Sequence, residues 1–111
     1  MTRTARVVTA SNRAAAGVYA DRGGPLIVEW LRERGFDVPD PVVVPDGEPV
    51  GEALRTAVAD GVDVVITPGG TGISPTAATP EVTRAVLDSE VPGLADAIRA
   101  VGAPTVPTAV L

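Results

Sequence analysis

Residues 62–72 read VDVVITPGGTG, a nearly continuous run of β-branched residues that passes directly into a glycine-rich stretch. β-branched residues pack well on the pleated surface of a sheet, so this run predicts a strand over residues 62–67. Runs with little polar alternation are typical of strands covered on both faces, as in parallel sheets flanked by helices. We therefore expect a parallel sheet with this strand in its interior.

The segments before and after this run alternate between two periodicities. Strands are expected over residues 5–9 and 42–44, with a last one over 107–111. Apolar residues recur at helical spacing in four segments, at residues 26–31, 50–58, 82–86 and 94–101. Strands that alternate with helices imply right-handed crossovers. The sequence therefore predicts a three-layer, doubly wound α/β fold with a largely parallel sheet, in one domain over residues 1–111.

Composition excludes several kinds of chemistry. The 111 residues include no cysteine and no histidine, which excludes disulfides, thiolate nucleophiles, serine–histidine relays and the usual zinc sites. The net charge of -5 argues against nucleic acid or an anionic membrane as partner. The N-terminus has no long apolar stretch of the kind found in signal peptides, so we expect a cytoplasmic protein.

Ligands of such sheets gather at the carboxyl ends of the strands, where the stretch TPGGTGISPT (residues 67–76) is expected to lie. Its glycines allow close approach of a ligand to the backbone, and its hydroxyls add hydrogen bonds, so it is suited to an anion. A plain strand-to-helix turn would explain the same glycines. The stretch is not a phosphate-binding P-loop, because the chain has no lysine, and Pro75 stands where a dinucleotide fingerprint has its third glycine.

Two other loops at strand ends carry polar residues. Asp46 follows the second strand within Pro45-Asp46-Gly47, a sequence that turn geometry alone would explain. Asp21 and Arg13, in the loop after the first strand, have the equally simple interpretation of solvated surface charges. Because all three loops are expected at one edge of the sheet, a carboxylate, an arginine and a glycine-rich loop would converge there.

Several motifs in this order resemble the MoaB/Mog family of molybdenum-cofactor biosynthesis proteins, which includes the gephyrin G domain. The resemblance covers nearly the whole chain. Its motifs are Ser11-Asn12-Arg13, Gly17-Val18-Tyr19 with Asp21, Gly24-Pro25, Pro45-Asp46, Gly69-Gly70-Thr71-Gly72, Thr79-Pro80-Glu81 and Pro92-Gly93-Leu94. The GGTG motif followed by Thr-Pro-Glu ten residues after its first glycine is specific, whereas GGTG alone would not be.

The resemblance implies a homotrimer that binds molybdopterin. In the enzymes of the family, ATP and Mg²⁺ serve to adenylylate the terminal phosphate of molybdopterin, with release of pyrophosphate. By match to the family, Asp46 is the catalytic carboxylate and a magnesium ligand. The implied substrate-binding residues are Ser11, Arg13, Asp21, Thr67, Gly69, Gly70, Thr71, Gly72 and Ser74.

The chain departs from the family at two places. Ala77 stands where the family's loop usually carries a second aspartate, two residues before Thr79. The chain also stops at Leu111, where the family continues, so the C-terminal part is expected to be truncated. Three functions therefore stay open: a molybdopterin adenylyltransferase, a molybdopterin-binding protein without turnover, and a general nucleotide-binding module that binds ATP but no pterin.

Overall fold

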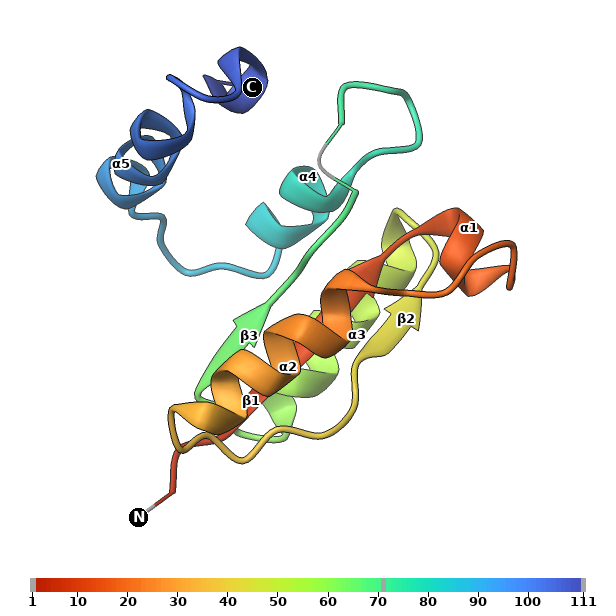
Figure 1. The fold of residues 1–111 in the computed structure, drawn as a ribbon. Helices are drawn as coiled ribbons and strands as arrows, with labels where there is room; N and C mark the ends of the chain where they lie inside the picture. Colours follow the sequence, from red (N-terminus) through yellow and green to blue (C-terminus); the bar gives the residue numbers. More distant parts are fainter. Residues whose placement is uncertain (1, 71, 111) are drawn as a thin grey trace.

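The structure is a computed structural model that describes residues 2–70 and 72–110 (Figure 1). Its elements are β1 (Ala5–Ala10), α1 (Asn12–Ala15), α2 (Gly23–Glu33), β2 (Val42–Val44), α3 (Glu48–Ala59), β3 (Val64–Ile66), α4 (Thr79–Arg84), α5 (Pro92–Gly102) and a 3-10 turn, η1 (Pro107–Val110). None of the helices in the described residues combines the length and the apolar character that a membrane crossing requires. The expected order of strands and helices is confirmed as far as α5, apart from the short α1, which was not expected.

The three strands form a parallel sheet in the order β2-β1-β3. Val8 of β1 pairs with Val42 of β2, and Ala5 of β1 pairs with Val64 of β3. The predicted α/β fold with a parallel sheet is thus confirmed, and the carboxyl ends of the strands meet at one edge. The interior position expected for residues 62–67 is wrong for the described sheet: β1 lies at the centre, and β3 lies at an edge with Val64 36% exposed.

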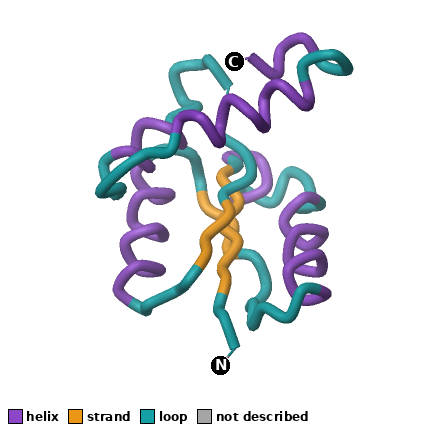
Figure 2. The backbone as a smooth tube through the Cα atoms, turned by 90° about the vertical axis from the view of Figure 1, so that its left-hand side faces the viewer, coloured by secondary structure: helices purple, strands orange, loops and turns teal. Residues whose placement is uncertain are grey.

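Helices cover both faces of the sheet, α2 on one side and α3 on the other (Figures 1 and 2). One core cluster joins Val7 of β1 to Val28 and Leu31 of α2. The second joins Ala10 of β1 to Val50 and Leu54 of α3. Because successive side chains of a strand point to opposite faces, β1 contributes to both clusters and is almost fully buried.

The face that α2 turns to the sheet matches the expected stripe only in part: Leu31 is buried and Ile27 packs against the core. Leu26 and Trp30 were expected within its apolar stripe, but they are 67% and 50% exposed. Besides Leu31, the helix buries Gly24 and Val28. The small Gly24 allows the first turn of the helix to approach β1, because a Cβ atom there would lie 2.8 Å from the Thr9 hydroxyl oxygen. The guanidinium of Arg34 lies 3.6 Å from the centre of the exposed Trp30 ring.

The elements that follow α4 pack loosely. The helix α4 begins at Thr79, with Pro80 and Glu81 in its first turn, whereas α5 has no buried residue and packs mainly on η1. The strand expected over residues 107–111 is wrong for residues 107–110, which form a 3-10 turn. Local bonds explain this turn, because the N–H of Ala109 donates to the carbonyl oxygen of Val106 at 2.9 Å, and Leu111 lies outside the described residues.

Candidate functional site at the carboxyl edge of the sheet

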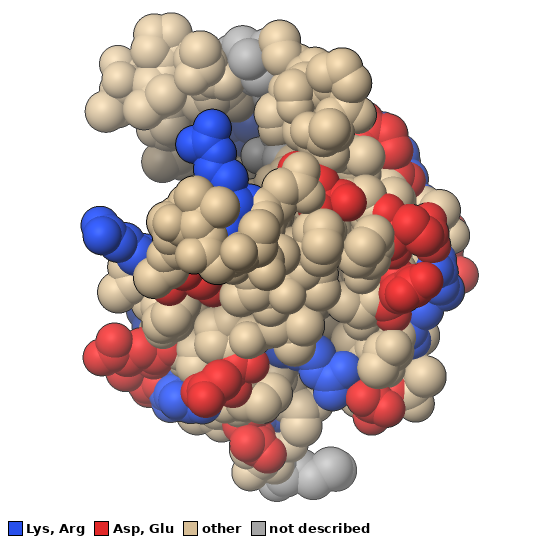
Figure 3. Space-filling view, turned by 90° about the vertical axis from the view of Figure 1, so that its right-hand side faces the viewer, with Lys and Arg blue, Asp and Glu red and all other residues tan. Residues whose placement is uncertain are grey.

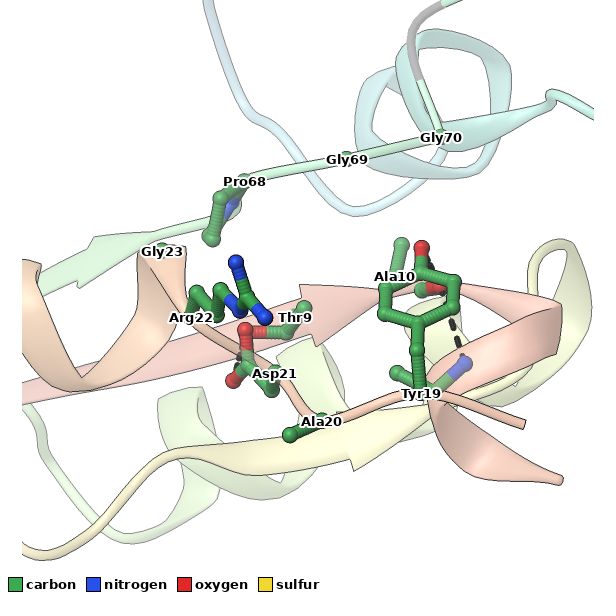
Figure 4. Close-up of a pocket in the computed structure, with 12 residues that line it drawn as sticks. Thr9, Ala10, Tyr19, Ala20, Asp21, Arg22, Gly23, Pro68, Gly69 and Gly70 are labelled. Carbon is green, nitrogen blue, oxygen red and sulfur yellow. Dashed lines mark hydrogen bonds between the residues drawn. The ribbon is translucent and has the colours of Figure 1, made fainter. Parts of the chain in front are cut away.

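A pocket of about 680 Å³ opens where β1 and β3 end (Figure 4). Two parts of the sequence that lie far apart form it: residues 9–23, from the end of β1 to the start of α2, and the glycine-rich loop at residues 68–70. The lining residues are Thr9, Ala10, Ser11, Ala14, Tyr19, Ala20, Asp21, Arg22, Gly23, Pro68, Gly69 and Gly70. The expected convergence of loops on this edge therefore holds for the first and third loops.

The glycine-rich loop lies directly against β1. The N–H of Ala10 donates to the carbonyl oxygen of Pro68 at 2.9 Å. Gly69 and Gly70 both have positive φ, 88° and 64°. A Cβ atom at Gly69 would overlap the carbonyl oxygen of Ala10, and one at Gly70 would overlap the hydroxyl oxygen of Thr79. The positive φ angles and the lack of room for a Cβ atom both require glycine at these two positions. Gly69 and Gly70 continue from the edge of the sheet and form one wall of the pocket.

Asp21 holds the start of α2 to β1. One carboxylate oxygen accepts a hydrogen bond from the Thr9 hydroxyl at 3.0 Å, and the other accepts one from the N–H of Gly24 at 3.1 Å. A side chain at the buried Gly24 would overlap both Asp21 and Thr9. The Asp21 carboxylate thus caps the first turn of α2 and fixes the floor of the pocket.

Ser11 and Tyr19 form the wall beside β1. The Ser11 hydroxyl oxygen accepts a hydrogen bond from the N–H of Ala14 at 3.2 Å and so caps α1. The same oxygen lies 2.9 Å from the hydroxyl oxygen of Tyr19, whose residue is 52% exposed. This second contact ties the Tyr19 side chain to the end of β1, while part of the residue stays accessible in the pocket.

Asp46 lies beside this wall and is not among the lining residues. The N–H of Asp46 donates to the side-chain oxygen of Asn12 at 2.9 Å, and the N–H of Ser11 donates to the carbonyl oxygen of Val44 at 2.9 Å. One carboxylate oxygen of Asp46 is buried and has no hydrogen-bond partner among the described residues. A buried oxygen of this kind is suited to a further hard ligand, because leaving it unpaired is costly.

The pocket gathers only some of the expected site residues. Ser11, Asp21, Gly69 and Gly70 line it, and Thr71 lies outside the described residues. The expected residues that do not line it are Arg13, Asp46, Thr67, Gly72 and Ser74. Ser74 belongs to a turn in which the N–H of Ala77 donates to its carbonyl oxygen at 3.1 Å.

The lining residues that were not among the expected site residues include Tyr19 and Arg22. Both lie in the loop that carries Asp21, so their position in a strand-end loop is the signal that would have found them. Asp21 and Arg22 are the charged residues among the described residues that line the pocket. Elsewhere, on the face drawn in Figure 3, acidic and basic side chains of the described residues lie interspersed.

No group of three or more histidine, cysteine, aspartate or glutamate side chains within residues 2–70 and 72–110 is arranged to hold a metal ion. A cation at this edge would therefore depend on few protein ligands. Mg²⁺ commonly binds through one or two carboxylates together with substrate phosphates and water. The single unpaired oxygen of Asp46 fits that mode of binding.

Residues 6–111 match the family described as probable molybdopterin binding domain. The chain belongs to this family. The resemblance to the MoaB/Mog proteins is thereby confirmed. A solved structure of MogA is 64% identical, with a TM-score of 0.95 over 98% of this chain and 72% of that chain. The Mog protein from Mycobacterium ulcerans is 60% identical, with a TM-score of 0.93 over 99% of this chain and 72% of that chain.

Curated relatives of this chain include the molybdopterin adenylyltransferase of Haemophilus influenzae, which is 39% identical over 109 residues. The match covers 95% of this chain and 55% of that relative. The chain therefore spans about half the length of this relative and under three quarters of the two solved chains.

Proposed function

We propose that this chain acts in molybdenum-cofactor biosynthesis, in the cytoplasm, as a Mg²⁺-ATP-dependent adenylyltransferase of molybdopterin. The observation that carries the proposal is the pocket at the carboxyl edge of a parallel sheet, in a chain whose family is defined by molybdopterin binding. Relatives named as molybdopterin adenylyltransferases support the reaction, with identities of 39% and 36%.

The proposed reaction joins a phosphate oxygen of molybdopterin to the α-phosphorus of ATP, and the bond from that phosphorus to the pyrophosphate group breaks. Such a transfer depends on positioning and on neutralising charge rather than on a protein nucleophile. In this proposal the backbone at Gly69 and Gly70 and the Ser11 hydroxyl orient the molybdopterin phosphate. Thr67, Thr71, Gly72 and Ser74, from the same loop, complete the substrate site.

Asp46 is the residue we assign to magnesium and to catalysis. Its unpaired, buried carboxylate oxygen offers one hard ligand, and the phosphates of the substrates would offer others. When bound there, Mg²⁺ would reduce the repulsion between the two phosphate groups. The tie between Asn12 and the N–H of Asp46 keeps this carboxylate next to Ser11, and hence next to the pocket.

The second candidate function is molybdopterin binding without turnover. The residue that favours it is Ala77, which stands where the family usually supplies another aspartate. Ala77 is half-buried, and its Cβ would lie 3.7 Å from a Cβ built at Gly72, so it lies at the base of the glycine-rich loop. With one carboxylate in place of two, the cation would be held less rigidly, and turnover would be low while affinity for molybdopterin is kept.

The test restores the second carboxylate. We expect Ala77→Asp to raise the rate of pyrophosphate release, with molybdopterin, ATP and Mg²⁺, at least tenfold, which is roughly 1.4 kcal/mol of barrier. Ala77→Asn is the matched control, because it has a similar size and lacks the charge, and it should leave the rate unchanged. Equal rates in all three proteins would contradict the metal-ligand role of this position. ATP binding without affinity for molybdopterin would contradict the proposed function itself.

We also propose that the chain assembles as a homotrimer, as its family implies. Supporting this, α5 exposes Leu94, Ile98 and Val101, which are 62%, 66% and 84% exposed. Apolar side chains gathered on one helix are typical of surfaces that become covered on association. Sedimentation at micromolar concentration should give a mass three times that of the chain, and a monomer would contradict the proposal.

A further inference from the structure

The two charged residues of the pocket differ in whether their side chains have hydrogen-bond or ion-pair partners within the protein. Asp21 directs both carboxylate oxygens to Thr9 and Gly24, as described above. Arg22 lies next to it in sequence and forms no ion pair within 4 Å among the described residues, whereas five other arginines do. The paired arginines are Arg6, Arg32, Arg55, Arg84 and Arg99.

Arg22 is also placed where an anion would enter. Its residue is exposed and lines the pocket, and in Figure 4 its side chain extends into the space between Asp21 and Pro68. It therefore lies between the floor of the pocket and the glycine-rich loop. We propose that Arg22 supplies the cationic contact to the ligand's phosphate in this pocket, beside the hydroxyl and backbone groups assigned to that phosphate above, an inference that rests on the proposed function of the same site.

Electrostatics explains why the pocket needs this cation. A phosphate that enters the pocket approaches the carboxylate of Asp21, and like charges repel across a few ångströms. The hydroxyls and glycines on the other walls can donate hydrogen bonds, but they carry no positive charge to balance the charge of Asp21. The guanidinium of arginine carries one, and its fixed pair of N–H groups matches two oxygens of a phosphate. Arg22 thus makes the pocket selective for anions even though Asp21 forms its floor.

The sequence motif Ser11-Asn12-Arg13 points to a different arginine. Arg13 is exposed on α1 and is not a lining residue of the pocket. It belongs to the short turn in which the N–H of Val18 donates to its carbonyl oxygen at 2.9 Å. The structure therefore favours Arg22 over Arg13 as the arginine that contacts the ligand, and the two residues give opposite predictions for the same experiment.

The experiment measures binding of inorganic pyrophosphate by calorimetry to the whole chain and its variants. We expect Arg22→Gln to weaken binding at least tenfold and Arg22→Lys to weaken it less, because lysine keeps the charge but not the paired N–H groups. Arg3→Gln is the matched control: it removes the same charge from an exposed arginine near the opposite end of β1, and it should change the affinity less than twofold. Thermal unfolding of each variant shows whether the fold is retained.

Three outcomes would overturn the inference. In the first, Arg22→Gln binds pyrophosphate as tightly as the unchanged protein, and in the second, Arg13→Gln weakens binding more than Arg22→Gln does. Should either occur while the unchanged chain still binds molybdopterin, the inference fails and the proposed function stands. The third outcome is an unchanged chain that binds neither pyrophosphate nor molybdopterin, and it overturns both. If Arg22→Gln does not fold, the comparison of Arg22→Lys with Arg3→Lys decides between the same outcomes.

Discussion

Two helices of this protein have the same length and a similar amphipathic pattern, yet they lie in very different surroundings. The helix α2 spans 11 residues and buries Gly24, Val28 and Leu31 against β1. The helix α5 also spans 11 residues, and none of its residues is buried. Apolar spacing therefore predicts that a helix forms and which side is apolar, but it does not predict whether a sheet lies beneath that side.

The largest expected effect comes from truncating one leucine in each helix. Leu31→Ala should destabilise the protein by ~2–5 kcal/mol, because Leu31 is 2% exposed and its removal leaves a cavity in the core. Leu94→Ala, the matched change in α5, should cost at most about 0.5 kcal/mol, since Leu94 is 62% exposed. Urea unfolding of dilute protein measures both. Equal losses of stability would show that α5 is packed as firmly as α2.

The second largest effect is expected at the contact between the glycine-rich loop and α4. The N–H of Thr79 donates to the carbonyl oxygen of Gly70 at 3.1 Å, and a side chain at Gly70 would overlap the Thr79 hydroxyl. We expect Gly70→Ala to cost ~2–3 kcal/mol, from a strained backbone and the displacement of α4.

Gly17 provides the control for this change. It also has a positive φ, 76°, but a Cβ atom there would meet nothing within 4 Å. Gly17→Ala should therefore cost only about 1 kcal/mol, from backbone strain alone. A Gly70→Ala variant that unfolds at the same urea concentration as Gly17→Ala would contradict the close contact between the glycine-rich loop and α4.

A smaller effect separates a structural carboxylate from a solvated one. Asp21→Ala removes the acceptor of the Thr9 hydroxyl and of the N–H of Gly24, and should cost ~1–2 kcal/mol. Asp88→Ala, in the exposed segment after α4, should be close to neutral. Thermal unfolding of both variants measures the difference. If Asp21→Ala left the melting temperature unchanged, the capping role of Asp21 would be wrong.

The smallest expected effects are those of ion pairs. Arg6 and Asp60 join β1 to the end of α3 at 3.1 Å, with side chains 21% and 53% exposed. Arg99 and Asp96 pair within α5 at 3.2 Å, with side chains 45% and 75% exposed. Double-mutant cycles should give a coupling of up to about 1 kcal/mol for the first pair and ~0.3 kcal/mol for the second. A stronger coupling between Arg99 and Asp96 than between Arg6 and Asp60 would contradict the expectation that α5 is the less firmly packed part of the molecule.

Much of the fold could be predicted from local patterns. The alternation of β-branched runs with helical stripes predicted the parallel α/β sheet, and the stripe at residues 82–86 predicted α4. The position of strands within the sheet could not be read in this way. The β-branched run at residues 62–67 suggested an interior strand, but β1 is central because it pairs on both sides. The order of the strands depends on how all of them pair, so the sequence of a single strand does not predict its position in the sheet.

The candidate site shows the same limit. The motifs include Ser11, Asp21, Gly69 and Gly70, which line the pocket because residues at strand ends meet at one edge of a parallel sheet. They did not reveal that Asp21 serves the fold, since a loop carboxylate and a helix cap look alike in a sequence.

The central claim is that molybdopterin binds in the pocket at the carboxyl edge of the sheet, and backbone amide chemical shifts test it most directly. Titration of the isotopically labelled chain with molybdopterin, without oxygen, should shift the amides of Ser11, Tyr19 to Gly23, Gly69 and Gly70. The amides of α5 should stay in place at sub-stoichiometric ligand. Shifts confined to residues 92–110, or unchanged amides around the pocket at saturating molybdopterin, would contradict the claim.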